Sequence, residues 1–332
     1  TVVADGFTRS ELVDLLHQHS APIGLVDRLP SASLDDDETG RWHGSLIAVT
    51  GPGGAGSSTL AMALAQGLAV DPRRRNLVAL ADLCLDADLA MMHDAQDVIP
   101  GVQELVDAHR MGTPSLEEIR SLTFDGGVRG YRLLLGLRHH RDWTAIRVRA
   151  FEAALTSIRR CNRIVVADVD DDLEGESDTG STDVEDRNLM ARTVVSQADL
   201  VLAVGLPSLT GLHHLVRSCG RLLAAGLDAE RLIPVINRSP RNSRARSSVT
   251  STFAELIGTE QLARNPIHVG DKRGVEESLL DGVPLPAGLV DSITRPTDAL
   301  LESVGPRSPV TAVEPVAVQP GSLGHWTDEE AG

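Results

Sequence analysis

Aromatic side chains are scarce in this sequence, since Phe, Trp and Tyr together make up 2% of its 332 residues. A hydrophobic core must then be built from Ala, Val, Leu and Ile, which are plentiful. Cysteine is also rare: Cys84, Cys161 and Cys219 are an odd number and have no C-x-x-C spacing. This usage predicts neither a disulfide framework nor a zinc site, and it is typical of a reducing compartment such as the cytoplasm.

Lysine is almost absent, because Lys272 is the only one among the 31 lysine and arginine residues. The 47 acidic residues leave a net charge of −16, which argues against nucleic acid or an anionic membrane as the partner of the whole surface. No apolar run approaches the roughly 20 residues that cross a bilayer, and no basic segment followed by an apolar one opens the chain. We therefore expect a cytoplasmic protein that does not insert directly into a membrane.

Composition divides the chain into three regions. Residues 1–44 carry short apolar and amphipathic segments and end in an acidic linker at 35–40, so we expect an N-terminal extension. Residues 45–304 alternate apolar strand patterns with helical patterns, which fits one α/β domain. Residues 305–332 combine prolines, small residues and an acidic end, which predicts a disordered C-terminal tail.

The expected elements of the central region alternate regularly. Near-continuous apolar runs are typical of buried parallel strands, and they occur at 46–50, 77–81, 131–137, 163–167, 200–205, 231–237 and, in short form, 266–269. Helical spacing of apolar residues occurs at 60–70, 102–108, 115–122, 143–158, 188–197, 209–223, 249–257 and 288–304. The acidic residues 170–186 are expected to form a mobile loop at the sheet edge. This order predicts an α/β fold with a doubly wound, mostly parallel sheet, helices on both faces and a ligand at the carboxyl ends of the strands.

Residues 46–60 carry the most specific signal. An apolar strand pattern leads into a glycine-rich loop, and a helical pattern starts near Ser58. Glycines let the backbone turn tightly and bring several N–H groups to an anion, and the helix adds its positive N-terminal end. The spacing fits the phosphate-binding pattern G-x-x-x-x-G-K-[ST], with Gly51 and Gly56 as framing glycines, but Ser57 stands in place of the lysine. A purely structural turn with a tightly packed helix is the alternative interpretation.

Two aspartates, Asp82 and Asp168, each end an apolar strand pattern, so this fold would bring them to the edge that carries the loop. A role in the site is one interpretation, and capping of the following helix is the other. Asp86 and Asp88 fit a solvated loop better.

Four arginines lie among serines after the strand pattern at 231–237, and a solvated loop is the simplest interpretation of this basic stretch. A contact with nucleotide, an acidic partner or DNA is the alternative. The histidine pairs at 139–140 and 213–214 are not expected to share a metal, because neighbouring side chains point apart. The four arginines are Arg238, Arg241, Arg244 and Arg246.

The order of these segments resembles the MinD/ParA family of deviant P-loop (SIMIBI-class) ATPases, most closely its CpaE/TadZ pilus-assembly or septum-site-determining branch. The resemblance covers the central region, and the segments that carry it are 51–59, 82–90, 164–168, 198–204 and 235–238. It implies a bound ATP and Mg²⁺. The residues that it assigns to the nucleotide are Gly51, Pro52, Gly53, Gly54, Ala55, Gly56, Ser57, Ser58, Thr59, Asn237 and Arg238.

The resemblance also assigns roles beside the phosphates. It places Ser58 and Asp168 at the magnesium ion and Asp82 next to the phosphates as a catalytic residue. Members usually have lysine where Pro52 and Ser57 stand, and their second strand ends Asp-x-Asp where this chain has Cys84 as the third residue. Because phosphoryl transfer depends on positioned positive charge, its loss costs orders of magnitude in rate. We therefore predict a degenerate ATPase with weak or absent hydrolysis.

The function that this resemblance implies is a cytoplasmic positioning or assembly factor. It would act as a homodimer and recruit protein partners of a pilus, secretion or division apparatus, and partners would bring it to the pole, septum or inner membrane. The acidic end of the chain differs from a basic amphipathic helix, so direct membrane docking is not expected. A nucleotide-free pseudo-ATPase scaffold is the first alternative. A ParA-type DNA-partitioning protein is the second, with DNA the less expected partner.

Overall fold

Eight strands form one sheet in the computed structural model, which describes residues 43–95, 99–258 and 262–304. The strands are β1 (Ser45–Thr50), β2 (Val78–Asp82), β3 (Phe124–Asp125), β4 (Arg132–Leu134), β5 (Ile164–Asp168), β6 (Leu200–Gly205), β7 (Leu232–Ser239) and β8 (Ile267–Gly270). Their order across the sheet is β3-β4-β2-β5-β1-β6-β7-β8. All neighbours are parallel except β3 and β4, which are antiparallel.

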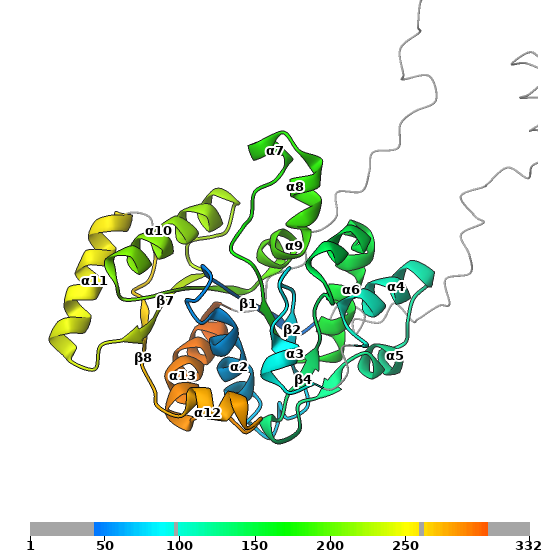
Figure 1. Cartoon of the computed structure of the whole chain (residues 1–332), viewed down its shortest axis with the longest axis horizontal. Helices are drawn as coiled ribbons and strands as arrows, with labels where there is room; N and C mark the ends of the chain where they lie inside the picture. The colour runs from blue at the N-terminus through cyan, green and yellow to red at the C-terminus, as the bar shows by residue number, and fades with distance from the viewer. Residues whose placement is uncertain (1–42, 96–98, 259–261, 305–332) are drawn as a thin grey trace, which may run out of the picture. The chain divides into compact units, whose positions relative to one another are not determined.

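Helices cover both faces of this sheet (Figure 1). They are α2 (Ser57–Leu68), α3 (Leu89–Met92), α4 (Val102–Met111), α5 (Leu116–Ser121), α6 (Val148–Cys161), α7 (Glu176–Thr179), α8 (Thr182–Arg187), α9 (Leu189–Gln197), α10 (Leu209–Ala224), α11 (Ser243–Ile257), α12 (Val275–Leu280) and α13 (Ala287–Val304). One layer contains α2 packed on α13, and the other contains α4, α6, α9 and α10. The predicted doubly wound, mostly parallel α/β sheet is confirmed.

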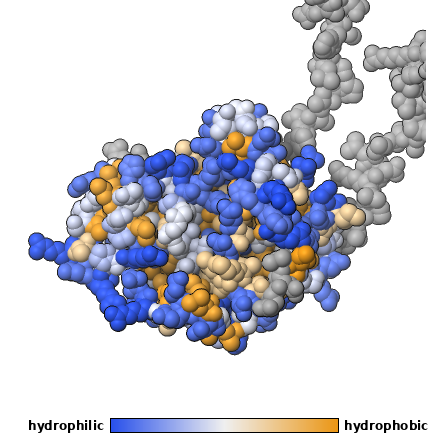
Figure 2. Space-filling model, in the orientation of Figure 1, coloured by the Kyte–Doolittle hydropathy of each residue, from blue (hydrophilic) through white to orange (hydrophobic). Residues whose placement is uncertain are grey.

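Burial alternates along the central strands. In β1, Leu46 and Ala48 belong to the core beneath α6 and α9, whereas Ile47 and Val49 belong to the core beneath α2 and α13. Successive strand residues point to opposite faces, and here both faces are covered, so the strand reads as an unbroken apolar run. Figure 2 shows a mostly hydrophilic exterior, with apolar side chains gathered toward the lower edge of the view around α12 and α13.

The strand order places a topological switch point at β1. The chain reaches β2 and β5 on one side of β1 and then crosses to β6 and β7 on the other. Asp82 pairs in register with Asp168, and Asp168 pairs in register with Val49. The carboxyl ends of β1, β2 and β5 therefore meet at one level, which is where doubly wound sheets bind ligands.

Two expected elements have other bounds. The strand predicted at 131–137 is limited to β4, where it pairs with the unpredicted short strand β3. The helix predicted at 143–158 begins at Val148, because Arg147 has extended backbone and the residues before it form the 3-10 helix η3 (His140–Ala145). The short helices α3 and α12 were also not predicted.

The basic stretch after β7 is more ordered than predicted. The helix predicted at 249–257 begins at Ser243, where the Asn242 side chain accepts a hydrogen bond from Arg244 N and caps it. Arg246, one turn into α11, donates from Nε to Pro240 O at 2.6 Å. The prediction of a solvated loop is therefore wrong for the part of the stretch that forms α11.

The prediction of a mobile loop at 170–186 is wrong in its secondary structure, because this segment contains α7 and most of α8. Gly175 N donates to the carboxylate of Asp178 at 3.0 Å at the start of α7. Arg187 at the end of α8 forms an ion pair with Asp172 at 2.7 Å. These local contacts stabilise helical turns in a strongly acidic segment.

The predicted extension at 1–44 and tail at 305–332 lie outside the described residues, apart from His43 and Gly44. The division of the chain at these points stays a prediction.

A histidine–tyrosine pair lies at the end of α3. His93 Nδ1 lies 2.6 Å from Leu89 O, and His93 Nε2 lies 2.6 Å from Tyr131 Oη. A neutral imidazole satisfies both contacts by donating from Nδ1 and by accepting from the tyrosine hydroxyl at Nε2. Burial lowers the pKa of His93 to about 4.

This pair should make the folded state less stable as the pH falls from 6.5 to about 4. The unfolded chain binds more protons than the folded one in this window, because the folded pKa of His93 lies below its unfolded value. The full difference corresponds to about 3 kcal/mol. Urea unfolding at pH 6.5 and at about pH 4 measures this difference. Between these two pH values, the free energy of unfolding should fall by about 3 kcal/mol more in wild type than in His93→Gln. Equal losses would contradict the assignment.

Candidate functional site

The loop that joins β1 to α2 depends on glycine for its shape. Gly54 and Gly56 have φ angles of +80° and +87°, a left-handed conformation that other L-residues rarely adopt. Gly56 is also the N-cap of α2, and a Cβ at this position would lie 2.6 Å from Asn237 Nδ2. The left-handed backbone conformation requires glycine here, and the side-chain amide of Asn237 occupies the space that a Cβ would need.

Most backbone N–H groups of this loop and of the first turn of α2 have no acceptor in the part of the chain that the structure describes. Ala55 N donates to Pro52 O at 3.0 Å and closes one tight turn. No side chain caps α2, and its first turn has no acidic residue. The amides without a described acceptor are those of Gly53, Gly54, Gly56, Ser57, Ser58 and Thr59. Such groups at a helix N-terminus form an anion-binding site.

Asn237 supports the loop from β7. Its Nδ2 donates to Ala55 O at 2.8 Å, and its Oδ1 accepts from Arg238 N at 2.8 Å. Arg238 itself has a φ of +49°, so the backbone turns directly after Asn237. The asparagine amide thus positions the loop, and its contact with adenine stays a prediction.

Three side chains gather beside the loop at the ends of β2 and β5. Asp82, Cys84 and Asp168 each offer a ligand atom, and these atoms lie within 4.8 Å of one another. The Ser58 hydroxyl on α2 faces Asp168 and acts to lower the pKa of its carboxyl. The structure therefore brings together both predicted acids and the predicted magnesium-side hydroxyl, and it adds Cys84.

Asp82 also fits the capping interpretation. Its Oδ2 accepts a hydrogen bond from Leu89 N, the first residue of α3, at 2.9 Å, and its Oδ1 accepts from Cys84 N at 3.4 Å. The capping interpretation is therefore confirmed by the contact with Leu89 N. The carboxylate also lies close to Asp168, and its role in the site stays a prediction.

Burial dominates the electrostatics of these side chains. It raises the pKa of Asp168 to about 7. Burial, and then the charge of Asp168, raise the pKa of Asp82 well above its usual value and raise the pKa of the Cys84 thiol. Without a cation, burial therefore favours the protonated form of all three groups, and Asp168 is about half protonated near neutral pH.

The carboxylate of Asp168 fits a cation. The residue is 1% exposed, and its Oδ1 has no hydrogen-bond partner among the described residues. A buried carboxylate oxygen without a donor is costly, and a bound cation would satisfy it. The oxygens of Ser58 and Asp168 suit Mg²⁺, whereas the sulfur of Cys84 suits a softer ion.

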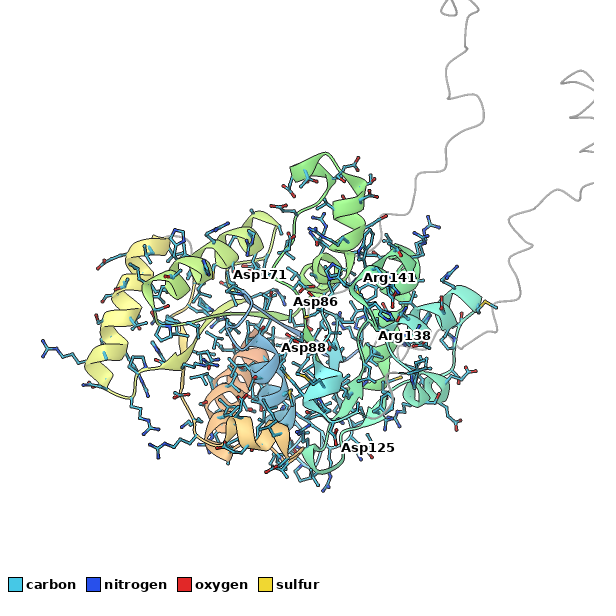
Figure 3. The ribbon with its side chains drawn as sticks, in the orientation of Figure 1. Asp86, Asp88, Asp125, Arg138, Arg141 and Asp171 are labelled. Carbon is cyan, nitrogen blue, oxygen red and sulfur yellow. The ribbon has the colours of Figure 1, made fainter. Side chains whose placement is uncertain are left out.

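Further acids extend along this edge of the sheet. Figure 3 shows Asp86 and Asp88 close to α3, with Asp171 farther toward α10. Asp86 and Asp88 are exposed, as predicted, and Asp86 pairs with His140 at 3.0 Å. The edge is thus strongly negative, which favours a cation over a bare anion.

A cleft of about 390 Å³ opens on the Gly56 side of the loop. It is lined by Asn237 and Arg238 of β7 and by residues 270–277, which run from the end of β8 to the first turn of α12. Lys272 lines this cleft and forms no ion pair with any residue that the structure describes. The sequence analysis did not place Lys272 at the site, because Lys272 is far from residues 51–59 along the chain. The strand pattern at 266–269 was the available signal, since whatever follows a parallel strand lies at the ligand-binding edge.

A smaller cavity of about 170 Å³ lies on the Pro52 side of the loop. His214, Arg217 and Arg221 of α10 line it together with Asp171. Arg221 is fixed by a 2.5 Å hydrogen bond to Asp171, whereas Arg217 has no ion pair within the described ranges. A cavity of about 420 Å³ between residues 173–178, α9 and α10 is larger, but none of the predicted nucleotide contacts lines it.

Comparisons with known proteins address the fold. No family model and no curated protein matches the sequence. A ParA family ATPase from Chlorobium tepidum TLS matches in structure with a TM-score of 0.59 and 18% identity, over 77% of this chain and 98% of its own. This chain has the ParA/MinD fold.

Two further structures with the ParA/MinD fold match. The septum site-determining protein MinD complexed with Mg-ADP, from Pyrococcus horikoshii OT3, has a TM-score of 0.56 and 16% identity over 79% of this chain and 98% of its own. A MinC:MinD cell division protein complex from Aquifex aeolicus has a TM-score of 0.54 and 16% identity over 77% of this chain and 96% of its own. The predicted resemblance is confirmed for the fold, and the CpaE/TadZ branch stays a prediction.

Within residues 43–95, 99–258 and 262–304, no helix has both the length and the hydrophobicity to cross a bilayer.

Proposed function

We propose that this chain binds ATP with Mg²⁺ at residues 51–59 and acts as a positioning factor of the ParA/MinD type. The observation that carries the nucleotide proposal is the group of loop amides that donate to no described acceptor, directly at the start of α2. Backbone N–H groups and the positive end of a helix bind phosphate without an ammonium group. Asn237 keeps this arrangement in place through Ala55 O.

Two cations from outside the loop would contribute to nucleotide binding in this proposal, although neither occupies position 52 or 57 of the loop itself. Lys272 approaches from the cleft that includes Gly56, and Arg217 from the cavity that includes Pro52. Neither side chain forms an ion pair with a described residue, so each is available to a phosphate oxygen. Charge-assisted hydrogen bonds of this kind are about twice as strong as neutral ones.

Ser58 and Asp168 would hold Mg²⁺, which supplies charge neutralisation at the phosphates when it is bound. Asp82 stays the proposed catalytic residue, and its contact with Leu89 N orients the carboxylate toward Asp168. Pro52 and Ser57 remove two ammonium groups from the phosphates, and catalysis of phosphoryl transfer depends mainly on such positioned charge. We therefore propose slow or absent hydrolysis.

The proposed cellular role is that of a homodimer that recruits protein partners of a pilus, secretion or division apparatus. Its support is the likeness to a ParA family ATPase, to a septum site-determining MinD and to a MinC:MinD complex. Such partners would bring the protein to the pole, the septum or the inner membrane. The alternative is a nucleotide-free scaffold of the same fold, which would show no binding of Mg-ATP in the experiment below.

Replacement of Lys272 by alanine should weaken Mg-ATP binding about 10-fold, which corresponds to the loss of one charge-assisted contact. Titration calorimetry on the full chain measures this. Arg73→Ala is the matched control, because the Arg73 side chain is 81% exposed, pairs with Asp71 and does not line the cleft. Equal affinities of the two variants would remove Lys272 from the site. Absence of binding in wild type would favour the scaffold.

A further inference from the structure

Cys84 contributes a ligand of a different kind to the side chains at the ends of β2 and β5. Its sulfur lies within 4.8 Å of a carboxylate oxygen of Asp82 and of one of Asp168. It takes the position where the MinD/ParA pattern usually has a second aspartate. Cys84 is a free thiol that is only partly exposed, and it faces Asp82 and Asp168 across the edge of the sheet.

A second observation points to a ligand between these groups. Asp168 is 1% exposed, and its Oδ1 has no hydrogen-bond partner in the described part of the chain. Asp82 is equally buried, but each of its oxygens accepts only one backbone N–H. Two buried carboxylates side by side repel each other when both are ionised, so unused oxygen lone pairs here call for a positive partner.

We infer that, in the chain without nucleotide, Asp82, Cys84 and Asp168 form a mixed carboxylate–thiolate site that selects a thiophilic divalent cation such as Zn²⁺ over Mg²⁺. Mg²⁺ requires near-octahedral oxygen ligands and keeps several waters, so a sulfur in its first shell is unfavourable. Zn²⁺ takes thiolate and carboxylate ligands together in a tetrahedral arrangement. The site shares Asp168 with the Mg²⁺ of the proposed function, but cation binding without nucleotide does not rest on that function.

The distances are compatible with this site. Zn²⁺ binds sulfur at about 2.3 Å and carboxylate oxygen at about 2.1 Å, so tetrahedral ligands lie about 3.5 Å apart. The three ligand atoms already lie within 4.8 Å of one another, and rotation of the Cys84 and Asp168 side chains can close the rest. The Ser58 hydroxyl, which faces Asp168, would supply the fourth ligand.

Cobalt titration of the full chain without nucleotide tests this inference. Co²⁺ occupies zinc sites, and a thiolate ligand gives an absorption band in the near ultraviolet that oxygen and histidine ligands do not give. Wild type should show this band at one Co²⁺ per chain, Zn²⁺ should abolish it, and millimolar Mg²⁺ should leave it unchanged. Cys84→Ser should lose the band and at least about 10-fold in affinity. Cys84→Asp should lose the band and compete more readily with Mg²⁺.

Cys161→Ser is the control, because Cys161 is a buried thiol in α6 and should leave the band intact. A band that persists in Cys84→Ser, or displacement by millimolar Mg²⁺ in wild type, would overturn the inference, and the second result does not depend on any variant. Binding of Mg-ATP without a thiolate band would refute this cation site and leave the proposed function intact. A thiolate band in a protein that binds no nucleotide would support this cation site and refute the proposed nucleotide binding.

Discussion

Asp168→Asn should stabilise the cation-free protein at pH 8 and at the same time abolish the stabilisation that Mg-ATP gives. Burial raises the pKa of Asp168 from 3.8 to about 7, so ionising this carboxyl opposes folding. A group with a raised folded pKa loses its favourable contribution as the pH rises through that value. The difference corresponds to about 4 kcal/mol above pH 7. The variant should therefore melt on the order of 10 °C higher than wild type when no cation is present.

The pH dependence and a matched control make this prediction specific. The advantage of Asp168→Asn should shrink to below about 2 kcal/mol at pH 5, where most of the wild-type carboxyl is protonated in the folded protein. Asp86→Asn removes a charge from the same edge at a side chain that is 80% exposed, and it should change neither the melting temperature nor the effect of Mg-ATP. A variant at Asp168 that is less stable than wild type at pH 8 would contradict the account of this carboxylate.

The second large effect is expected at the opposite edge of the sheet. Asp199 directly precedes β6 and is fully buried. Its carboxylate accepts hydrogen bonds from Leu46 N at 2.7 Å and from Arg159 Nη2 at 3.3 Å. It also lies 3.8 Å from the guanidinium of Arg231. Arg159 is 7% exposed, so removal of the carboxylate leaves a buried guanidinium without its counter-charge. Asp199→Ala should lower the free energy of unfolding by about 3–5 kcal/mol.

Chemical unfolding measures this loss, and two variants separate its causes. Asp199→Asn keeps an acceptor for Leu46 N and should lose less than the alanine variant. Combining Asp199→Ala with Arg159→Met should recover part of the loss, because the unpaired charge is gone. A loss below 1 kcal/mol for Asp199→Ala would show that the pair contributes little. Nucleotide binding should persist in these variants wherever they fold, since they alter the amino ends of the strands.

The strands and the loop of this fold were predictable from local sequence. The residues of β1, β5 and β6 are buried on both faces of a parallel sheet, and such a strand has to be apolar along its whole length. The glycines of the loop follow from a backbone that turns through left-handed conformations. Asp82 and Asp168 came together as expected, because they end neighbouring parallel strands in register.

The rest of the site depends on contacts that one stretch of sequence does not contain. Lys272 reaches the cleft beside Gly56 only because β8 pairs with β7 and delivers the next segment to the same edge. Cys84 appeared in the sequence as a departure from a family pattern, and cysteine spacing predicted no zinc site. Its closeness to Asp168 needs the pairing of β2 with β5. Ligands from two strands are invisible to a search for C-x-x-C spacing.

Local energetics explain the wrong predictions of secondary structure. The segment 170–186 has the acidic composition of a solvated loop, yet the ion pair of Arg187 with Asp172 and the cap at Gly175 stabilise its helical turns. The helix predicted from 143 begins at Val148 because Arg147 is extended. Apolar periodicity gave no sign of this break.

Titration calorimetry of Mg-ATP into the full chain, beside Asp168→Asn, tests the central claim most directly. The account predicts saturable binding of one nucleotide per chain, with divalent-cation dependence that the variant loses. No binding of ATP or ADP at millimolar concentration, with a melting temperature that nucleotide leaves unchanged, would contradict it and would show that the amides at the start of α2 serve the fold alone.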